Sequence, residues 1–275
     1  MEKLRNFLTV HKATVILIAV LGLLALGGYF AFQKFAAKSS TPVEEVDLSF
    51  DSEGPYALLF PRRDGNALIL DLKRTSSYES ISYELAYMAE GVDRGVMGEV
   101  NTKEKKGEYE QEILFGTCSK NVCKYDKGVE NGTLVLKIKK ENKLFKMITQ
   151  WHLQKPDVAL GVLSSGDSHL IYKVNADRQT LSNAGFTIVN DLTGVPKLPS
   201  GKQILGKVYS LNAPIAKNLP TGDLSIELAE NPPDGAKLFR FDGSNWQELE
   251  TKIDGSKLSA KASGSGIFAV LVSKK

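Results

Sequence analysis

The sequence is poor in the residues on which most catalytic and metal sites depend. Its 275 residues include two cysteines and three histidines, and one of these histidines, His11, precedes the longest apolar run. There is no Gly-rich phosphate loop, no His-rich segment and no paired-carboxylate motif. Because so few histidines and cysteines are present to act as bases, nucleophiles or ligands, we expect no enzyme, and no catalytic, cofactor-binding or metal site.

The sequence also lacks an excess of charge of either sign. Lysine and arginine number 35, and aspartate and glutamate number 32. Three of the basic residues and one of the acidic residues precede residue 34, so residues 34–275 carry a net charge of +1. A domain that binds nucleic acid through its phosphates needs a basic surface. We therefore expect no nucleic-acid partner.

Charged residues are absent from residues 13–32 (ATVILIAVLGLLALGGYFAF). Twenty helical residues span about 30 Å, the thickness of the hydrocarbon core of a bilayer. The alternative is a cleaved leader ending near Ala36 and Ala37, but the run is longer than the apolar part of most signal peptides. We predict a retained transmembrane helix that contacts the lipid bilayer, preceded by a cytoplasmic tail at residues 1–12.

The flanking charges predict the orientation of this helix. Three basic residues precede it, and two follow it before the acidic stretch at residues 44–53. Basic residues favour the cytoplasmic side of a membrane. We expect a single-pass protein of the cell membrane, with its N-terminus in the cytoplasm and its later domains outside the cell.

A polar linker at residues 33–45 leads into a region of period-two patterning. In residues 80–89 (SISYELAYMA), Ile81, Tyr83, Leu85 and Tyr87 share one face, which is typical of a half-buried antiparallel strand. Without helical patterns between them, such strands predict an immunoglobulin-like β-sandwich at residues 46–193. We predict strands at 56–60, 66–72, 80–89, 111–116, 133–139, 144–153, 169–174 and 185–189, with a turn at Asn131-Gly132.

A second region of the same kind follows residues 194–201 (GVPKLPSG), whose two prolines and two glycines predict a linker. Asp242-Gly243 and Asp254-Gly255 are strong hairpin signals between apolar runs. We predict strands at 206–213, 223–229, 237–241, 246–253, 257–262 and 267–272. The predicted fold class is mainly β: an N-terminal transmembrane helix followed by two extracytoplasmic immunoglobulin-like β-sandwich domains, the second at residues 202–275.

Cys118 and Cys123, in the segment CSKNVC, are the only cysteines. An exported domain meets an oxidising environment in many bacteria, and the four residues between the cysteines are enough for the chain to turn back. Two free thiols and a metal site are the alternatives. Zinc would need two further ligands, and the closest histidine in the sequence is His152. We predict a structural disulfide.

Two histidines, His152 and His169, follow the predicted membrane helix. His152 comes directly after Trp151 in a predicted strand, so the two side chains point to opposite faces, and we expect a surface or half-buried histidine. Residues 164–169 (SSGDSH) bring serine, aspartate and histidine together. Catalytic triads are assembled from distant segments, however, and a stretch rich in serine and glycine predicts a turn.

Five lysines gather in the two predicted strands at 133–139 and 144–153: Lys137, Lys139, Lys140, Lys143 and Lys146. One interpretation is a solvated hairpin whose lysines discourage edge-to-edge pairing of sheets. The other is contact with anionic wall polymers or lipid head groups. Nearby glutamates such as Glu141 favour the first interpretation, and the second defines a candidate contact site.

The segment at 237–272 (KLFRFDGSNWQELETKIDGSKLSAKASGSGIFAVLV) resembles the last strands of ZU5-like and related β-sandwich modules of bacterial surface proteins. The shared pattern is an aromatic strand, an Asp-Gly turn, a tryptophan, a polar strand and a closing Phe-Ala-Val strand. The segments at 114–129 and 187–202 are similar to single-pass bacterial membrane proteins without a known activity. The resemblance implies a β-sandwich fold and carries no catalytic residue.

These patterns favour a membrane-anchored, extracytoplasmic and non-enzymatic module of the cell envelope. Such a module acts as a structural spacer or binds another envelope protein or a wall polymer. One alternative is an accessory subunit of a membrane or secretion complex, with the anchor helix as an interaction surface. The other is an envelope hydrolase that uses carboxylates brought together from distant parts of the chain.

Overall fold

The structure is a computed structural model that describes residues 44–47, 54–75, 78–100, 102, 107–120, 122–141, 143–215 and 217–274, the first four by their backbone alone. The predicted cytoplasmic tail, the predicted transmembrane helix and nearly all of the predicted linker at 33–45 lie outside these residues. No helix within the described ranges has the length and apolar character needed to span a bilayer. Residues from Glu45 onward form one unit.

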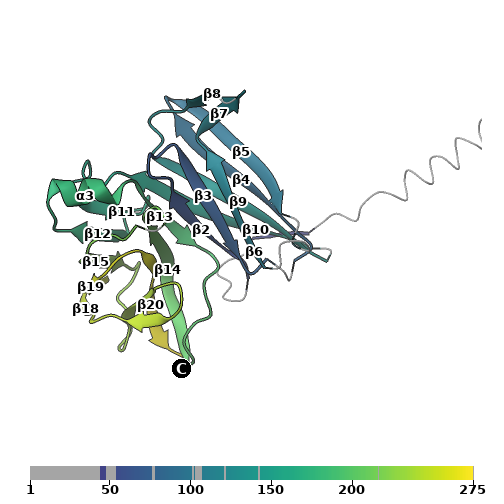
Figure 1. Ribbon diagram of the computed structural model, residues 1–275. Coiled ribbons are helices and arrows are strands. Elements are labelled where there is room, and N and C mark those ends of the chain that lie inside the picture. The colour runs from purple at the N-terminus through teal and green to yellow at the C-terminus, as the bar shows by residue number, and fades with distance from the viewer. Residues whose placement is uncertain are drawn as a thin grey trace, which may run out of the picture. The chain divides into compact units, whose positions relative to one another are not determined.

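The largest sheet contains ten strands in the order β17-β16-β20-β14-β13-β10-β9-β4-β5, with β1 also paired to β10 (Figure 1). Neighbours along this path are antiparallel. The strands are β1 (Glu44–Asp47), β4 (Ser80–Ala89), β5 (Val92–Val100), β9 (Asn131–Lys140), β10 (Lys143–Gln154), β13 (Thr187–Leu192), β14 (Lys202–Asn212), β16 (Lys237–Phe241), β17 (Trp246–Glu248) and β20 (Gly266–Ser273).

Two smaller sheets and a separate hairpin complete the described β structure. A three-stranded sheet consists of β2 (Tyr56–Pro61), β3 (Ala67–Lys73) and β6 (Glu108–Leu114). A five-stranded sheet has the order β11 (Val162–Ser164), β12 (Leu170–Val174), β15 (Gly222–Glu227), β19 (Lys257–Ala262) and β18 (Lys252–Asp254). The hairpin pairs β7 (Gly116–Ser119) with β8 (Val122–Tyr125). The short helix α3 (Arg178–Ala184) is capped by Asp177, whose carboxylate accepts the Thr180 N–H at 2.9 Å.

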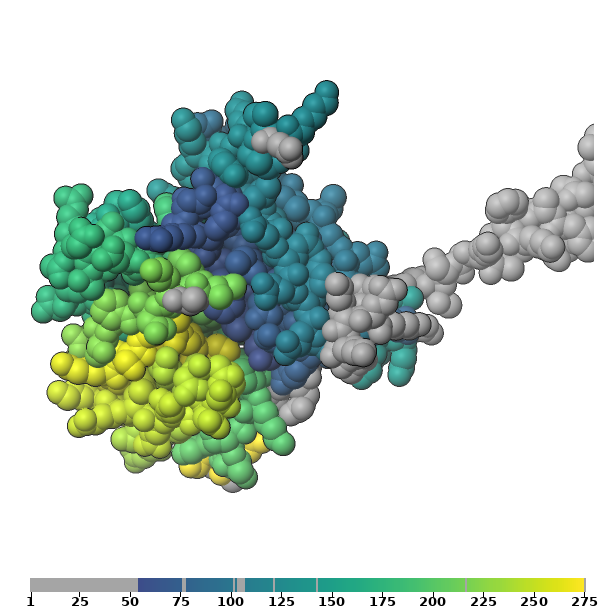
Figure 2. Space-filling model, in the orientation of Figure 1, coloured from purple at the N-terminus to yellow at the C-terminus, as the bar shows by residue number. Residues whose placement is uncertain are grey.

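The two smaller sheets cover opposite faces of the large sheet. Ile188 of β13 packs in a core with residues of β2 and β3, whereas the next residue, Val189, packs with residues of β12, β15 and β19. Successive side chains of a strand point to opposite faces. The β2-β3-β6 sheet therefore covers one face, and the five-stranded sheet covers the other face further along. In Figure 2 the darkest blue atoms belong to the stretch that contains β2 and β3, and the yellow atoms to the C-terminal strands.

An aromatic cluster fills the core beneath the first half of the large sheet. Phe115 stacks on the fully buried Trp151 with ring centroids 5.7 Å apart, and it meets Tyr87 edge-on at 5.0 Å. Gly132 lies directly opposite both Trp151 and Tyr87 in the sheet. A Cβ atom at Gly132 would lie 2.2 Å from Trp151 Cζ2, so only glycine leaves room for the indole ring.

This close packing explains why the predicted turn at Asn131-Gly132 is wrong. Both residues belong to β9, where the glycine serves the packing of an aromatic ring and not a change of chain direction. The predicted strand at 246–253 is also wrong as a single element. It divides into β17, in the large sheet, and β18, in the five-stranded sheet.

The mainly β, antiparallel character of the prediction is confirmed. In β4 the buried residues alternate as predicted, and Asp242-Gly243 and Asp254-Gly255 join β16 to β17 and β18 to β19. Strand β5 was not predicted. Its sequence, VDRGVMGEV, contains two glycines and shows little alternation of apolar and polar residues.

The predicted linker at 194–201 joins two paired strands. β13 ends before it and β14 begins after it, and the two pair over five residues of each strand. One hydrophobic cluster includes Val189 from before the linker and Tyr209, Phe268 and Val270 from after it. The sequence predicts that residues 202–275 fold independently. Because β13 and β14 pair and pack across the boundary, we expect instead that the fragment does not fold alone, and a test is given in the Discussion.

Candidate functional site

The described residues leave one face of the large sheet open at β5, β4, β9 and β10. Residues whose side chains alternate with the buried ones define this open face: Asp93, Gly95, Met97 and Glu99 of β5; Ser82, Glu84, Ala86 and Met88 of β4; Thr133, Val135 and Lys137 of β9; and Lys146, Ile148 and Gln150 of β10. Met97, Met88 and Ile148 are 78%, 58% and 45% exposed. The opposite face of the same four strands is buried under the three-stranded sheet.

A groove of about 860 Å³ runs over this open face. The register places Gly95, Ala86, Thr133 and Gln150 side by side across four strands. Three of these four residues are small, so the sheet is hollowed along this row. The exposed carboxylates of Glu84 and Asp93, and the side chain of Met88, line the same groove.

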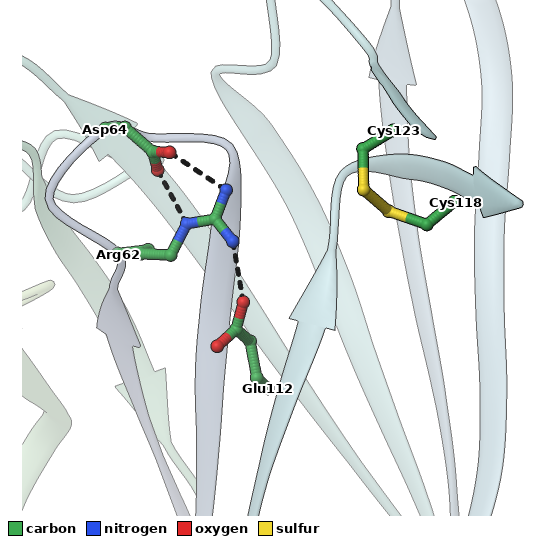
Figure 3. Close-up of a disulfide and its surroundings, with 5 residues drawn as sticks. All are labelled: Arg62, Asp64, Glu112, Cys118 and Cys123. Atoms are coloured by element: carbon green, nitrogen blue, oxygen red, sulfur yellow. Dashed lines mark hydrogen bonds and ion pairs between the residues drawn. A yellow bond between two sulfur atoms is a disulfide. The ribbon is translucent and has the colours of Figure 1, made fainter. Parts of the chain in front are cut away.

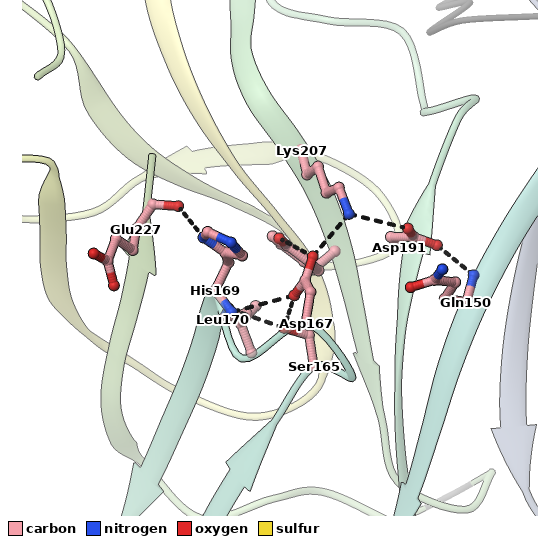
Figure 4. Close-up of polar contacts among 9 residues, drawn as sticks. Gln150, Ser165, Asp167, His169, Leu170, Asp191, Lys207 and Glu227 are labelled. Carbon is pink, nitrogen blue, oxygen red and sulfur yellow. Dashed lines mark hydrogen bonds and ion pairs between the residues drawn. The ribbon is translucent and has the colours of Figure 1, made fainter. Parts of the chain in front are cut away.

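The turn between β11 and β12 forms one side of the groove through Gly166. The Asp167 carboxylate holds this turn to β14, because it accepts a hydrogen bond from Lys207 Nζ at 2.8 Å (Figure 4). It accepts another from the Tyr209 hydroxyl at 3.1 Å. Within the turn it accepts a further bond from Ser165 Oγ at 2.5 Å. The turn is thus a fixed wall and not a loose loop.

The environment of this network shifts the pKa of Asp167 and the pKa of Tyr209. Partial burial raises the pKa of Asp167, but the hydrogen bonds from Lys207, Ser165 and the His169 N–H outweigh burial and lower the pKa to about 2. Burial, together with the neighbouring Asp167 carboxylate, raises the pKa of Tyr209 far above its usual value. Asp167 is therefore ionised, and Tyr209 is a neutral donor, at neutral pH.

The same network reaches the floor of the groove. Lys207 Nζ lies 3.8 Å from Asp191, and Asp191 accepts the backbone N–H of Gln150 at 2.6 Å. Burial raises the pKa of Asp191. Gln150 is the last residue of the row that starts at Gly95, so an ion pair and two hydrogen bonds join the wall of the groove to its floor.

The stretch at 164–169 forms the predicted turn. Ser168 donates its N–H to the Ser165 carbonyl at 2.9 Å, and Ser165 pairs across the turn with Leu170 at 3.0 Å. The imidazole of His169 points away from Asp167, and its Nδ1 lies 3.1 Å from the Glu227 carbonyl (Figure 4). Serine, aspartate and histidine do not form a triad here. His152 is half-buried, as predicted, with Nδ1 3.0 Å from the Ser164 carbonyl.

The five lysines lie in the β9-β10 hairpin, and the register brings four of them into directly opposed pairs. Lys137 faces Lys146, and Lys140 faces Lys143. Lys139 pairs with Glu79 at 3.2 Å. Like charges placed opposite each other destabilise a sheet slightly. Contact of Lys137, Lys139, Lys140, Lys143 and Lys146 with an anionic polymer stays a prediction.

The predicted disulfide is present. Cys118 and Cys123 are directly opposite residues of the β7-β8 hairpin, with Cα atoms 4.0 Å apart, and both are exposed (Figure 3). A two-stranded hairpin of this length has little stability by itself. The bond therefore adds a covalent link to a hairpin that pairs over only four residues of each strand.

Arg62 lies near this hairpin and holds the β2-β3 turn to β6. Its guanidinium pairs with Asp64 at 2.8 Å and with Glu112 at 2.7 Å (Figure 3). It also lies over the Tyr125 ring of β8, 5.3 Å from the ring centroid. The hydrogen bond between Arg62 and Asp64 raises the pKa of Arg62 and lowers the pKa of Asp64. These contacts fix the base of the hairpin.

A second cavity, of about 550 Å³, lies between the loop at 126–130 and the turn at 155–159. Asp64, Asp126, Glu130 and His152 line it together with Phe186. Across the described ranges, no group of three or more His, Cys, Asp or Glu side chains is arranged to hold a metal ion.

Comparison with known proteins assigns no function to these features. The sequence matches no protein-family model, and no curated protein is significantly similar to it. The groove residues Gly95, Ala86, Thr133 and Gln150 were not predicted from the sequence, because their alignment depends on the pairing of four strands.

Proposed function

We propose that this protein is a non-enzymatic binding module of the bacterial cell envelope. In this proposal residues 13–32 anchor it in the cell membrane, the N-terminus is cytoplasmic, and two β-sandwich halves that share the large sheet lie outside the cell. The module resembles the ZU5-like and related sandwich modules of bacterial surface proteins. Its partner is another envelope protein, which binds the open face defined above.

The observation that carries this proposal is the face of β5, β4, β9 and β10 that the described part of the chain does not cover. A sheet in a self-contained domain normally buries its apolar side chains against another layer. Here Met88, Met97 and Ile148 are exposed beside a groove whose wall is held rigidly by Asp167. Exposed apolar side chains gathered around a groove are typical of a protein interaction site.

The carboxylates of the groove support binding over hydrolysis. A glycoside hydrolase needs one carboxyl group in an apolar site, so that it stays protonated at neutral pH and can donate a proton. Glu84 and Asp93 are both exposed to solvent. They are suited to pairing with basic side chains of a partner.

Site-specific crosslinking of the full chain in its native membrane tests the proposal. A photoreactive residue replaces Met97 or Ile148 on the open face, or Ile253 of β18 as a matched control that is 48% exposed. We expect positions 97 and 148 to give the same discrete protein adduct and position 253 to lack it. Equal adducts at all three positions, or none at positions 97 and 148, would refute a partner on the open face.

The proposed membrane topology has a separate test. Protease added to intact spheroplasts should digest residues 40–275 and leave a small membrane-protected fragment. Protection of the large part of the chain would show the opposite orientation. Release of the whole protein in soluble form would refute the proposed membrane anchor.

A further inference from the structure

Strand β5 forms one edge of the large sheet. It pairs with β4 on one side, and no other described strand pairs with it. In an antiparallel pair, alternate residues turn their N–H and C=O groups away from the partner. β5 is nine residues long and contains no proline, so each N–H group that points away from β4 can donate a hydrogen bond. Its charged residues Asp93, Arg94 and Glu99 restrict which strand can pair there. Its backbone is therefore able to accept a further strand.

Hollows flank this edge on both faces of the sheet. On the open face lies the groove of about 860 Å³, which includes Asp93 and Gly95. On the other face lies a cavity of about 330 Å³ between β5 and the β7-β8 hairpin, lined by Arg94, Thr117 and Lys124 among others. An added strand points alternate side chains to the two faces. Both sets of side chains would find space here.

The two hollows carry opposite charge. Asp93 and Glu84 line the open groove, and neither forms an ion pair with another described residue. Arg94 and Lys124 line the hollow beside the hairpin. The acid there, Asp126, is 3.9 Å from Arg94 and accepts a hydrogen bond from Tyr87 at 3.0 Å. Arg94 also lines part of the open groove, but its side chain alternates with that of Asp93 and reaches Asp126, so it lies on the face of the hairpin. The open face is thus acidic, and the hairpin face, with Arg94 and Lys124 against Asp126, has an excess of one positive charge.

This charge pattern disfavours a second copy of β5 as the antiparallel partner. If two copies of β5 pair in antiparallel fashion, a twofold axis perpendicular to the sheet relates them, and their open faces lie on the same side. Asp93 and Glu99 of one copy then lie next to the same acidic residues of the other copy. Arg94 likewise approaches the basic face of the other copy. Like charges on neighbouring strands repel. The complementary partner has the opposite alternation.

We infer that β5 binds an extended segment of another protein as an added antiparallel strand. The segment places acidic side chains toward Arg94 and Lys124, on the side of the β7-β8 hairpin, and basic side chains toward Asp93 and Glu84, in the open groove. This inference rests on the proposed function and deepens it, because it states how the partner binds and which side chains it presents. The disulfide contributes by fixing the hairpin that forms the basic wall.

Peptide binding to the full chain in detergent tests the inference. Two labelled peptides have the length of β5 and the same composition of glutamate and lysine. In one the two residues alternate singly, so that each face of an extended strand has one sign of charge. In the other they alternate in pairs, so that both signs occur on each face. We expect fluorescence anisotropy to show about tenfold tighter binding of the first peptide.

Charge reversal identifies the site. Asp93→Lys and Arg94→Glu should each weaken binding of the singly alternating peptide several-fold, whereas Asp254→Lys, an exposed reversal in β18, should not. Circular dichroism checks that each variant folds, and the comparison of peptides on the unchanged protein does not depend on any variant.

Equal affinity of the two peptides would overturn the inference, as would equal effects of the three reversals. Self-association of the full chain that the singly alternating peptide abolishes would overturn it in favour of a second copy. These results are independent of crosslinking from positions 97 and 148. If the crosslinks form and the peptides fail, the open face binds its partner without strand addition, and if the crosslinks fail, the proposed function itself is refuted.

Discussion

Replacement of Gly132 by alanine tests the packing that places the groove over the aromatic core. The added Cβ would lie 2.2 Å from Trp151 Cζ2 and 2.3 Å from the Ala86 carbonyl oxygen. Both atoms belong to neighbouring strands, one in the buried Trp151 ring and one in the backbone of β4, so neither can move without disturbing the sheet. Overpacking of this kind costs about 1–3 kcal/mol. For a chain of this length the melting temperature falls by about 2–4 °C per kcal/mol.

Gly95→Ala is the matched control. Gly95 lies in the same sheet, on β5, and the nearest atom to its added Cβ would be the Leu85 carbonyl oxygen at 3.5 Å, an ordinary contact. Neither glycine has the positive φ that disfavours other residues. We therefore expect Gly95→Ala to leave stability unchanged or to raise it by up to about 1 kcal/mol, through the smaller entropy of the unfolded chain.

Urea unfolding of the full chain in detergent, followed by tryptophan fluorescence, gives the two free energies. We expect the midpoint to fall for Gly132→Ala, with an unchanged slope, and to stay constant or rise for Gly95→Ala. Equal losses of unfolding free energy in the two variants would show that any glycine replacement in these strands is costly, whatever its contact with Trp151. No loss in Gly132→Ala would show that Trp151 does not lie over this glycine.

Three further predictions concern the disulfide, the groove wall and the predicted domain boundary. Alkylation of unreduced, denatured protein should label neither Cys118 nor Cys123, and Cys118→Ser should lower stability by about 2 kcal/mol; full labelling without reduction would refute the bond. Asp167→Asn should reduce the loss of unfolding free energy that occurs as the pH falls below about 4. The folded pKa of about 2 lies below the ordinary value of 3.8, so Asp167 stabilises the protein above about pH 4 and this contribution is lost as pH falls toward 2; parallel acid limbs in the wild type and the variant would assign the loss to other groups. The fragment 202–275 should give a random-coil circular dichroism spectrum, because it loses the β13 partner of β14; a cooperative thermal transition would instead support separate domains.

Local features of the chain are readable from the sequence because they depend on neighbouring residues. The alternation of Ile81, Tyr83 and Leu85 identifies the buried face of β4, since a strand repeats every two residues. The Asp-Gly pairs identify two hairpins because they suit tight turns between strands. The spacing of Cys118 and Cys123 allows a bond across one short hairpin. None of these features needs a distant partner.

The tertiary structure alone decides what distant segments do together. β13 pairs with β10 on one side and with β14 on the other, which carries the large sheet across the linker predicted at 194–201. Gly132 in the sequence indicates a turn, but in the fold it makes room for Trp151. The edge position of β5 and the row from Gly95 to Gln150 likewise exist only after four strands have paired. Strand patterning specifies which face of a strand is buried, whereas the choice of neighbouring strand depends on packing between residues far apart in the chain.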